Sequence, residues 1–262
     1  MGRHVVAALA ILGVVVSLAG VGSALGEKAE PKIDPKANDV IQRWSQAAGR
    51  VTNFRLRVED TIDQVLDTGQ KVQYSHVRTA TISRPNRLHM EVVGDLANVT
   101  IWKDEKTFTI LDRDGNEYWQ VSAPGTIDET MDMLLERYGV SMPLADLLTA
   151  DVQKGLTNRV EAGAYLGLHH VGESKCHHLL FTQADIDWQV WVEEVGRPII
   201  RKLVITYKNE PGQPQYTLRN LGVETPDQVP AKTFQFEAPA GAKKIEVPPK
   251  GRIRPSKSGE SR

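Results

Sequence analysis

The side chains best suited to chemistry are histidines and a cysteine gathered in one short stretch of the sequence: His169, His170, Cys176, His177 and His178. Imidazole and thiolate groups are good ligands for zinc or copper. If the cysteine begins a strand, alternation places Cys176 and His178 on one face and His177 on the other. At most two of these three can then converge, although a hairpin partner can bring His169 or His170 across the turn.

We therefore expect this stretch to form a hairpin flanked by polar residues, with a small buried thiol and no bound metal or other cofactor. A metal-dependent enzyme that uses the His/Cys cluster stays open as an alternative.

Other motifs that could carry chemistry are weak. Asp112, Asp114 and Asn116 resemble the start of a calcium loop, but Ala123 stands where that loop requires glutamate. Turn chemistry accounts for them better. The sequence has no nucleophile elbow, phosphate loop or Walker-type glycine run, so we expect a protein that is not an enzyme.

A set of large apolar residues at alternating positions is suited to binding a ligand without a reaction. Methionine among them can adapt to variable chains. A packed core shows the same alternation, so the sequence leaves open whether these residues line a groove or fill a core. The candidates for the lining are Leu88, Met90, Val92, Phe108, Ile110, Trp119, Trp188 and Val190.

These residues need a sheet to position them, and apolar residues recur with a period of two over much of the sequence. We expect a helix over 37–49, a second over 126–138 and a short third over 144–148. About eleven strands are expected, at 54–66, 72–82, 88–92, 99–103, 107–111, 118–121, 165–171, 176–182, 188–193, 199–208 and 215–223.

The expected fold is mainly β with helices, of the α+β class. Consecutive antiparallel strands in this number accumulate twist, so the sheet must curve. We expect a half-barrel closed by the N-terminal helix and by a mid-chain helical lid over 126–148.

The N-terminus has the layout of a cleavable signal peptide. Basic residues at 3–4 precede an apolar run over 5–21, which ends in small residues at 22–26. We expect residues 1–26 to be removed and the protein to reach the periplasm. A retained membrane anchor is the rival interpretation, because the run is about long enough to cross a bilayer. No cysteine follows the run, so we expect no lipid modification there.

The rest of the chain is expected to form one domain over 27–247, followed by a disordered tail over 248–262 that lacks apolar periodicity. The 32 basic residues nearly balance the 33 acidic ones, which predicts no binding of nucleic acid. Peripheral contact with a membrane is compatible with this charge. A single cysteine, Cys176, allows no internal disulfide.

Four stretches of the sequence resemble a bacterial family of predicted periplasmic proteins of unknown function, and more distantly the outer-membrane lipoprotein carrier proteins (LolA/LolB-like). They are Ser83-Arg84-Pro85-Asn86-Arg87-Leu88, residues 101–108 (IWKDEKTF), residues 187–192 (DWQVWV) and residues 232–242 (KTFQFEAPAGA). The resemblance implies a curved antiparallel half-barrel of roughly eleven strands, whose better-known relatives carry or sense acyl chains.

We therefore expect a non-enzymatic periplasmic binding or carrier protein for an acyl chain, a lipid or another apolar ligand, including the acyl chain of a lipoprotein. A module that binds an envelope protein partner or senses envelope stress, through the same curved sheet, is the first alternative.

Overall fold

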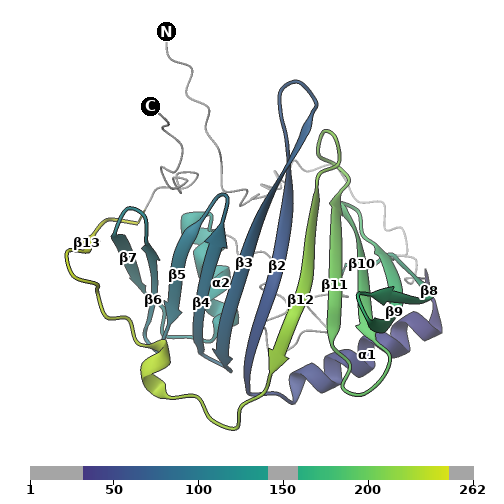
Figure 1. Cartoon of the computed structure of the whole chain (residues 1–262), viewed down its shortest axis with the longest axis horizontal. Coiled ribbons are helices and arrows are strands. Elements are labelled where there is room, and N and C mark those ends of the chain that lie inside the picture. Colours follow the sequence, from purple (N-terminus) through teal and green to yellow (C-terminus); the bar gives the residue numbers. More distant parts are fainter. Residues whose placement is uncertain (1–31, 141–158, 248–262) are drawn as a thin grey trace, which may run out of the picture.

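The computed structural model describes residues 32–140 and 159–247, and their strands form one curved sheet (Figure 1). Within these residues the sheet has thirteen strands. They are β1 (Lys32–Ile33), β2 (Asn53–Val65), β3 (Lys71–Ser83), β4 (Arg87–Gly94), β5 (Asn98–Lys103), β6 (Thr107–Asp112), β7 (Glu117–Ser122), β8 (Ala162–Val171), β9 (Ser174–Thr182), β10 (Ile186–Glu193), β11 (Ile200–Tyr207), β12 (Gln215–Glu224) and β13 (Lys243–Lys244). The helices are α1 (Pro35–Gly49), α2 (Ile127–Tyr138) and the 3-10 helix η1 (Ala231–Phe234).

The strands from β2 to β12 coincide with the eleven that the sequence predicts, which confirms a fold that is mainly β with helices. The count differs because β1 and β13, of two residues each, pair in parallel with β8 and β7 at the two edges of the sheet. Two residues are too few to show an alternating pattern. The predicted signal peptide, the helix over 144–148 and the tail over 248–262 lie outside the described residues.

The sheet is built from two meanders, β2 to β7 and β8 to β12, which join where β12 pairs antiparallel with β2. The first long strand of the chain therefore lies in the middle of the sheet. The single domain expected over 27–247 stays a prediction. No helix in the described part of the chain is long and apolar enough to cross a membrane.

Helix α1 begins at an N-cap, where the Asp34 carboxylate accepts hydrogen bonds from the backbone N–H groups of Lys36 (2.7 Å) and Ala37 (3.4 Å). Pro35 stands at the first helical position, where its missing N–H costs nothing. The buried residues of α1 recur at helical spacing and pack on the meander β8 to β12; they are Ala37, Val40, Ile41 and Trp44.

Helix α2 begins with a capping box in which Thr126 and Glu129 each accept a hydrogen bond from the other's backbone N–H. It ends at Gly139, whose φ of 67° suits glycine. Ile127 and Leu134 are buried against the meander β2 to β7.

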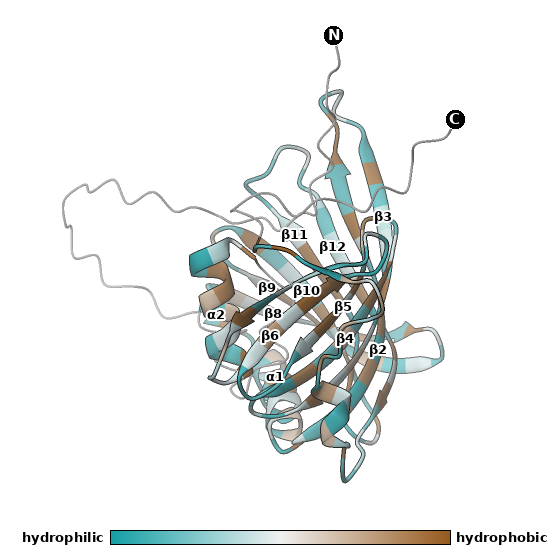
Figure 2. Cartoon of the chain, turned by 90° about the vertical axis from the view of Figure 1, so that its left-hand side faces the viewer, coloured by the Kyte–Doolittle hydropathy of each residue, from teal (hydrophilic) through white to brown (hydrophobic). Residues whose placement is uncertain are grey.

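Both helices lie on the same side of the sheet (Figure 2). We call this side the concave face. Its apolar residues form two clusters, one beneath each helix, and Leu56 of β2 packs against both. The opposite, convex face of β4 to β7 is crossed by the C-terminal segment, where the Phe236 ring lies 5.1 Å from Trp102 and 4.8 Å from Tyr118.

Candidate functional site

A cavity of about 160 Å³ opens on the concave face, between the C-terminal half of α1 and the centre of the sheet. Its lining is mostly apolar. Side chains from the helix and the loop that follows it face side chains from β2, β11 and β12, and the apolar lining includes Trp44, Val51, Phe54, Val58, Ile200 and Leu218.

The size of the cavity suits a small apolar ligand. Apolar cavities of about 150 Å³ bind ligands of the size of benzene. At about 160 Å³ the cavity is smaller than pockets for drug-sized ligands, which measure about 300–1,000 Å³. The cavity therefore has room for a short hydrocarbon segment of a ligand.

The eight candidates from the sequence lie on the concave face, but they divide between the two clusters. Met90 borders the cavity. Five others belong to the cluster beneath α2, where Ile110 is only partly buried, and two belong to the cluster beneath α1. Beneath α2 are Leu88, Val92, Phe108, Ile110 and Trp119, and beneath α1 are Trp188 and Val190.

Most of the cavity lining was missed by the sequence analysis, including Val58 and Leu218. Alternation in β2 and β12 assigns these residues to one face of a strand. It gives no sign that strands more than 150 residues apart lie side by side, as the pairing of Asp60 with Leu218 shows.

Arg84 anchors the chain at one end of the cavity, where α1 leads into β2. Its Nη1 donates hydrogen bonds to the carbonyl oxygens of Ala48 (2.6 Å) and Val51 (3.1 Å). Its guanidinium lies 5.0 Å from the centre of the Phe54 ring. Burial lowers the pKa of Arg84 below its ordinary value.

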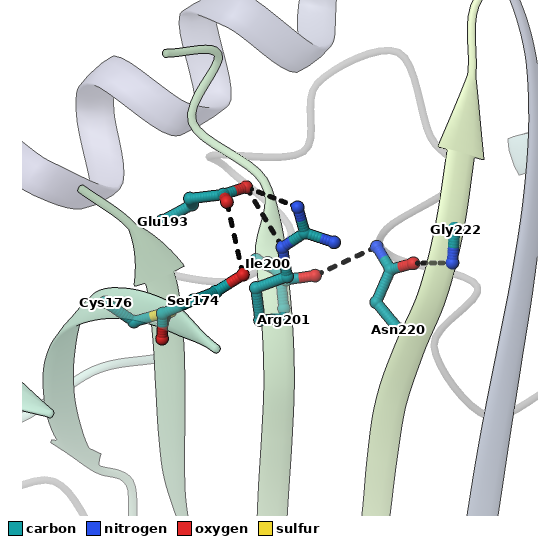
Figure 3. Close-up of polar contacts among 7 residues, drawn as sticks. All are labelled: Ser174, Cys176, Glu193, Ile200, Arg201, Asn220 and Gly222. Carbon is teal, nitrogen blue, oxygen red and sulfur yellow. Dashed lines mark hydrogen bonds and ion pairs between the residues drawn. The ribbon is translucent and has the colours of Figure 1, made fainter. Parts of the chain in front are cut away.

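Asn220 holds the opposite wall, at the point where the register of β12 against β2 shifts (Figure 3). Its Nδ2 donates to the carbonyl oxygen of Ile200 (3.0 Å), and its Oδ1 accepts from the backbone N–H of Gly222 (2.9 Å). On the neighbouring strands, Arg201 donates two hydrogen bonds to Glu193, at 2.7 and 2.9 Å. Both polar groups of the Asn220 amide are thus used to fix the wall.

A buried ionic cluster lies on the concave face beside the cavity. Arg78, which lines the cavity, donates from Nε and Nη2 to the two carboxylate oxygens of Asp60, at 2.6 and 3.1 Å. The side chain of Asp60 is 1% exposed, and His76 Nδ1 lies 3.4 Å from it. Tyr216 is buried alongside, and burial raises the pKa of its hydroxyl.

The charge on Asp60 is held in place by these neighbours. Burial alone would raise the pKa of Asp60, but its interactions with His76 and Arg78 outweigh burial and lower the pKa below its ordinary value. Asp60 and Arg78 therefore form an ion pair at neutral pH.

The His/Cys cluster lies in the hairpin β8–β9, and its faces are as alternation predicts. Cys176 packs with Trp191 and Val204 on the convex face, whereas the His177 Nδ1 lies 3.0 Å from the Tyr165 hydroxyl. Burial raises the pKa of the Cys176 thiol, which disfavours the thiolate that a metal requires.

The histidines of this hairpin contact other groups. His178 stacks on the Trp191 ring at 3.9 Å and lies within hydrogen-bonding distance of Gln189 and His169, at 3.1 and 2.9 Å. His170 lies at a separate groove of about 460 Å³ on the convex face, lined mostly by polar residues that include Glu59, Lys202 and Arg219. Burial lowers the pKa of His177 and of His178. Within residues 32–140 and 159–247, no three His, Cys, Asp or Glu side chains are placed to hold a metal ion.

The acidic residues that resemble a calcium loop form the turn between β6 and β7. The backbone N–H of Asp114 donates to the Asp112 carboxylate (3.1 Å), and Asn116 has a φ of 49°. Both features are typical of a tight turn.

The protein is thus an open, curved, mostly antiparallel sheet whose apolar concave face is covered by helices. The chain belongs to the DUF2092 family, described as predicted periplasmic proteins, because the family model matches residues 37–248. This membership confirms the family resemblance in the sequence. None of the curated proteins matches this chain.

Several solved structures are similar in outline. An uncharacterized conserved protein from Thermus thermophilus has 9% identity and a TM-score of 0.47, over 80% of this chain and 99% of that one. The Mycobacterium tuberculosis lipoprotein LppX has 12% identity and a TM-score of 0.42, over 75% and 100%. A LolA superfamily protein from Nitrosomonas europaea has 13% identity and a TM-score of 0.35, over 76% and 97%. At these values no ligand or role carries over from them to this chain.

Proposed function

We propose that this protein is a non-enzymatic periplasmic binding or carrier protein that holds an acyl chain, or a lipid through its acyl chain, in the cavity between α1 and the sheet. The observation that carries the proposal is the cavity itself, which is lined mainly by apolar side chains and bordered by a helix. Sheet and helices act in this proposal as a half-barrel around the ligand.

Burial of hydrocarbon provides the binding free energy. Each buried methylene contributes about 0.8 kcal/mol, so a segment of about five carbons gains roughly 4 kcal/mol before the costs of association. Met90 contacts the ligand directly, and the other seven candidates from the sequence support the concave face beside it. Release of the ligand by movement of a lid over 126–148 stays a prediction. The helix that borders the cavity is α1, whereas the predicted lid contains α2.

Native mass spectrometry of the protein, purified gently from the periplasm, tests this function. We expect a co-purifying acyl lipid near one per protein, identified after denaturing extraction. A clean mass with neither lipid nor metal, together with a stable protein partner in envelope pull-downs, would favour the interaction module instead.

A substitution that fills the cavity sharpens the test. Ala47 lines the cavity from α1, so Ala47→Phe should reduce the lipid occupancy at least tenfold. Gln46→Phe is the matched control, because Gln46 is exposed on the same helix and does not line the cavity. Equal lipid occupancy in the two variants would place the lipid elsewhere.

A further inference from the structure

The cavity is mostly apolar, but four of its lining residues are polar: Arg78, Arg84, Arg197 and Asn220. Asn220 uses its amide to fix β12 and β11, and Arg84 donates to the carbonyl oxygens at the end of α1. Arg197 is exposed and donates to Thr225 Oγ1 at 3.1 Å. Arg78 differs from these three because it lies deep in the concave face.

The register of the sheet places Arg78 in an apolar row. It stands opposite Val58 of β2 and opposite Val92 of β4, both of which are buried. The side chain of Arg78 is 19% exposed, and this exposed part borders the cavity. A ligand that fills the cavity therefore meets the Arg78 side chain.

The charge of this guanidinium is already balanced. Asp60 accepts two hydrogen bonds from it and is itself 1% exposed, so the pair carries no net charge. A guanidinium has five N–H donors, of which Asp60 takes two. Even with the Tyr216 hydroxyl beside it, Arg78 keeps N–H groups for a further acceptor.

We infer that Arg78 selects an uncharged carbonyl group, that of an acyl ester or amide, as the polar end of the ligand. A carbonyl oxygen accepts a hydrogen bond without adding charge. A carboxylate would add a second negative charge beside Asp60 in a cavity of low polarity, and burial of an unbalanced charge is costly. This inference rests on the proposed function and narrows its ligand from any acyl chain to an acylated compound.

The test compares three probes of similar length by isothermal titration calorimetry of the full mature chain: methyl laurate, methyl dodecyl ether and laurate. Measurements at pH 8 keep the carboxylate of laurate ionised. For the wild type we expect the ester to bind about tenfold or more tightly than either the ether or laurate.

Variants of the ion pair separate this inference from simple exclusion of charge by an apolar cavity. Asp60→Asn leaves the guanidinium with an unbalanced positive charge, so laurate should gain at least tenfold and overtake the ester. The double variant Arg78→Met with Asp60→Asn removes both charges together and limits the loss of stability. In it the ester and the ether should bind within about threefold of each other.

Each outcome distinguishes the inference from the function on which it rests. If none of the probes binds the wild type, the proposed function fails and the inference fails with it. If the ester and the ether bind the wild type equally well, or if Asp60→Asn leaves laurate weaker than the ester, the inference alone is overturned. The inference is also overturned if Arg197→Met loses the preference for the ester while the double variant keeps it. That result would place the carbonyl group of the ligand beside the exposed Arg197.

A last comparison identifies the source of the carbonyl, because glycerolipids and acylated proteins both supply one. Monolauroylglycerol and an N-lauroyl dipeptide present the same chain and an uncharged carbonyl. Tighter binding of the glyceride assigns a glycerolipid, and tighter binding of the dipeptide assigns an acylated protein; both results support the inference.

Discussion

The Nζ of Lys103, at the end of β5, donates a hydrogen bond of 2.8 Å to the carbonyl oxygen of Ala123, which lies between β7 and α2. It donates a second, of 2.7 Å, to the carbonyl oxygen of Asp104. The residue is fully buried on the concave face, opposite Leu88 and Phe108. Lys103 therefore connects the sheet to the segment from which α2 starts.

Lys103→Met should lower the free energy of unfolding by about 2 kcal/mol. Methionine fills similar space, but the buried carbonyl oxygen of Ala123 and the part-buried one of Asp104 lose their donor. This loss costs more free energy than is gained by removing a buried charge. Urea unfolding followed by tryptophan fluorescence measures the change. Lys106→Met, at an exposed position, is the control and should stay within about 0.5 kcal/mol of the wild type. If Lys103→Met is as stable as the wild type, the two hydrogen bonds contribute nothing net.

The pH dependence of the same lysine has a defined sign. Burial lowers the pKa of Lys103 in the folded protein, so between that pKa and the ordinary value near 10.4 the unfolded chain binds more protons. Stability should therefore rise with pH through this window in the wild type, relative to Lys103→Met. Unfolding curves of both proteins between pH 7 and 10.5 check this, and parallel pH profiles would contradict it.

Asp60 should account for part of the loss of folding stability at low pH. Its pKa is lowered in the folded protein, because its interactions with His76 and Arg78 outweigh the effect of burial. Its contribution is thus present above the ordinary pKa near 3.9 and is lost as the pH falls through the folded value. Asp60→Asn should flatten the loss of stability below about pH 4, as measured by unfolding at a series of pH values. Asp67→Asn, at an exposed turn, should keep the wild-type slope.

The secondary structure follows from the sequence because long strands such as β4 show one buried face. In β4, Leu88, Met90 and Val92 are buried while the residues between them are less so, and the period-two pattern found this strand directly. The same alternation assigned His177 and His178 to opposite faces. Local patterns of this kind need no knowledge of which strands are neighbours.

The position of the cavity could not be predicted in the same way. Its walls meet because β12 pairs with β2, and this pairing joins the last long strand of the described chain to the first. Arg78 and Asp60 are opposite charges on adjacent strands, yet in the sequence they look like polar residues of a solvated strand. Their burial depends on the helices and strands that surround them. For the same reason, the sequence pattern does not show that Met90, among eight similar candidates, is the one that lines the cavity.

The capping box of α2 gives a prediction about local stability. Thr126 accepts from the Glu129 backbone N–H at 3.2 Å, and its own N–H donates to the Glu129 carboxylate at 2.7 Å. Thr126→Ala should cost about 1 kcal/mol, and Thr126→Ser should cost much less because serine keeps the cap. Urea unfolding measures both, and equal losses in the two variants would assign the effect to packing of the threonine methyl group.

Arg84 links the stability of the protein to the shape of the cavity. Arg84→Met removes the donor to the carbonyl oxygens of Ala48 and Val51, at the end of the helix that borders the cavity. We expect a loss of about 2–4 kcal/mol in the free energy of unfolding, because hydrogen bonds from charged groups are strong and the two carbonyl oxygens are left without this partner.

The end of α1 should also loosen in Arg84→Met, so lipid occupancy in native mass spectra should fall by more than the unfolded fraction explains. Arg55→Met is the matched control, since Arg55 forms an exposed ion pair with Glu224 at 3.8 Å and its loss should cost less than about 1 kcal/mol. Wild-type stability with reduced occupancy would assign Arg84 to ligand contact alone, whereas reduced stability with full occupancy would show that the end of α1 does not shape the cavity.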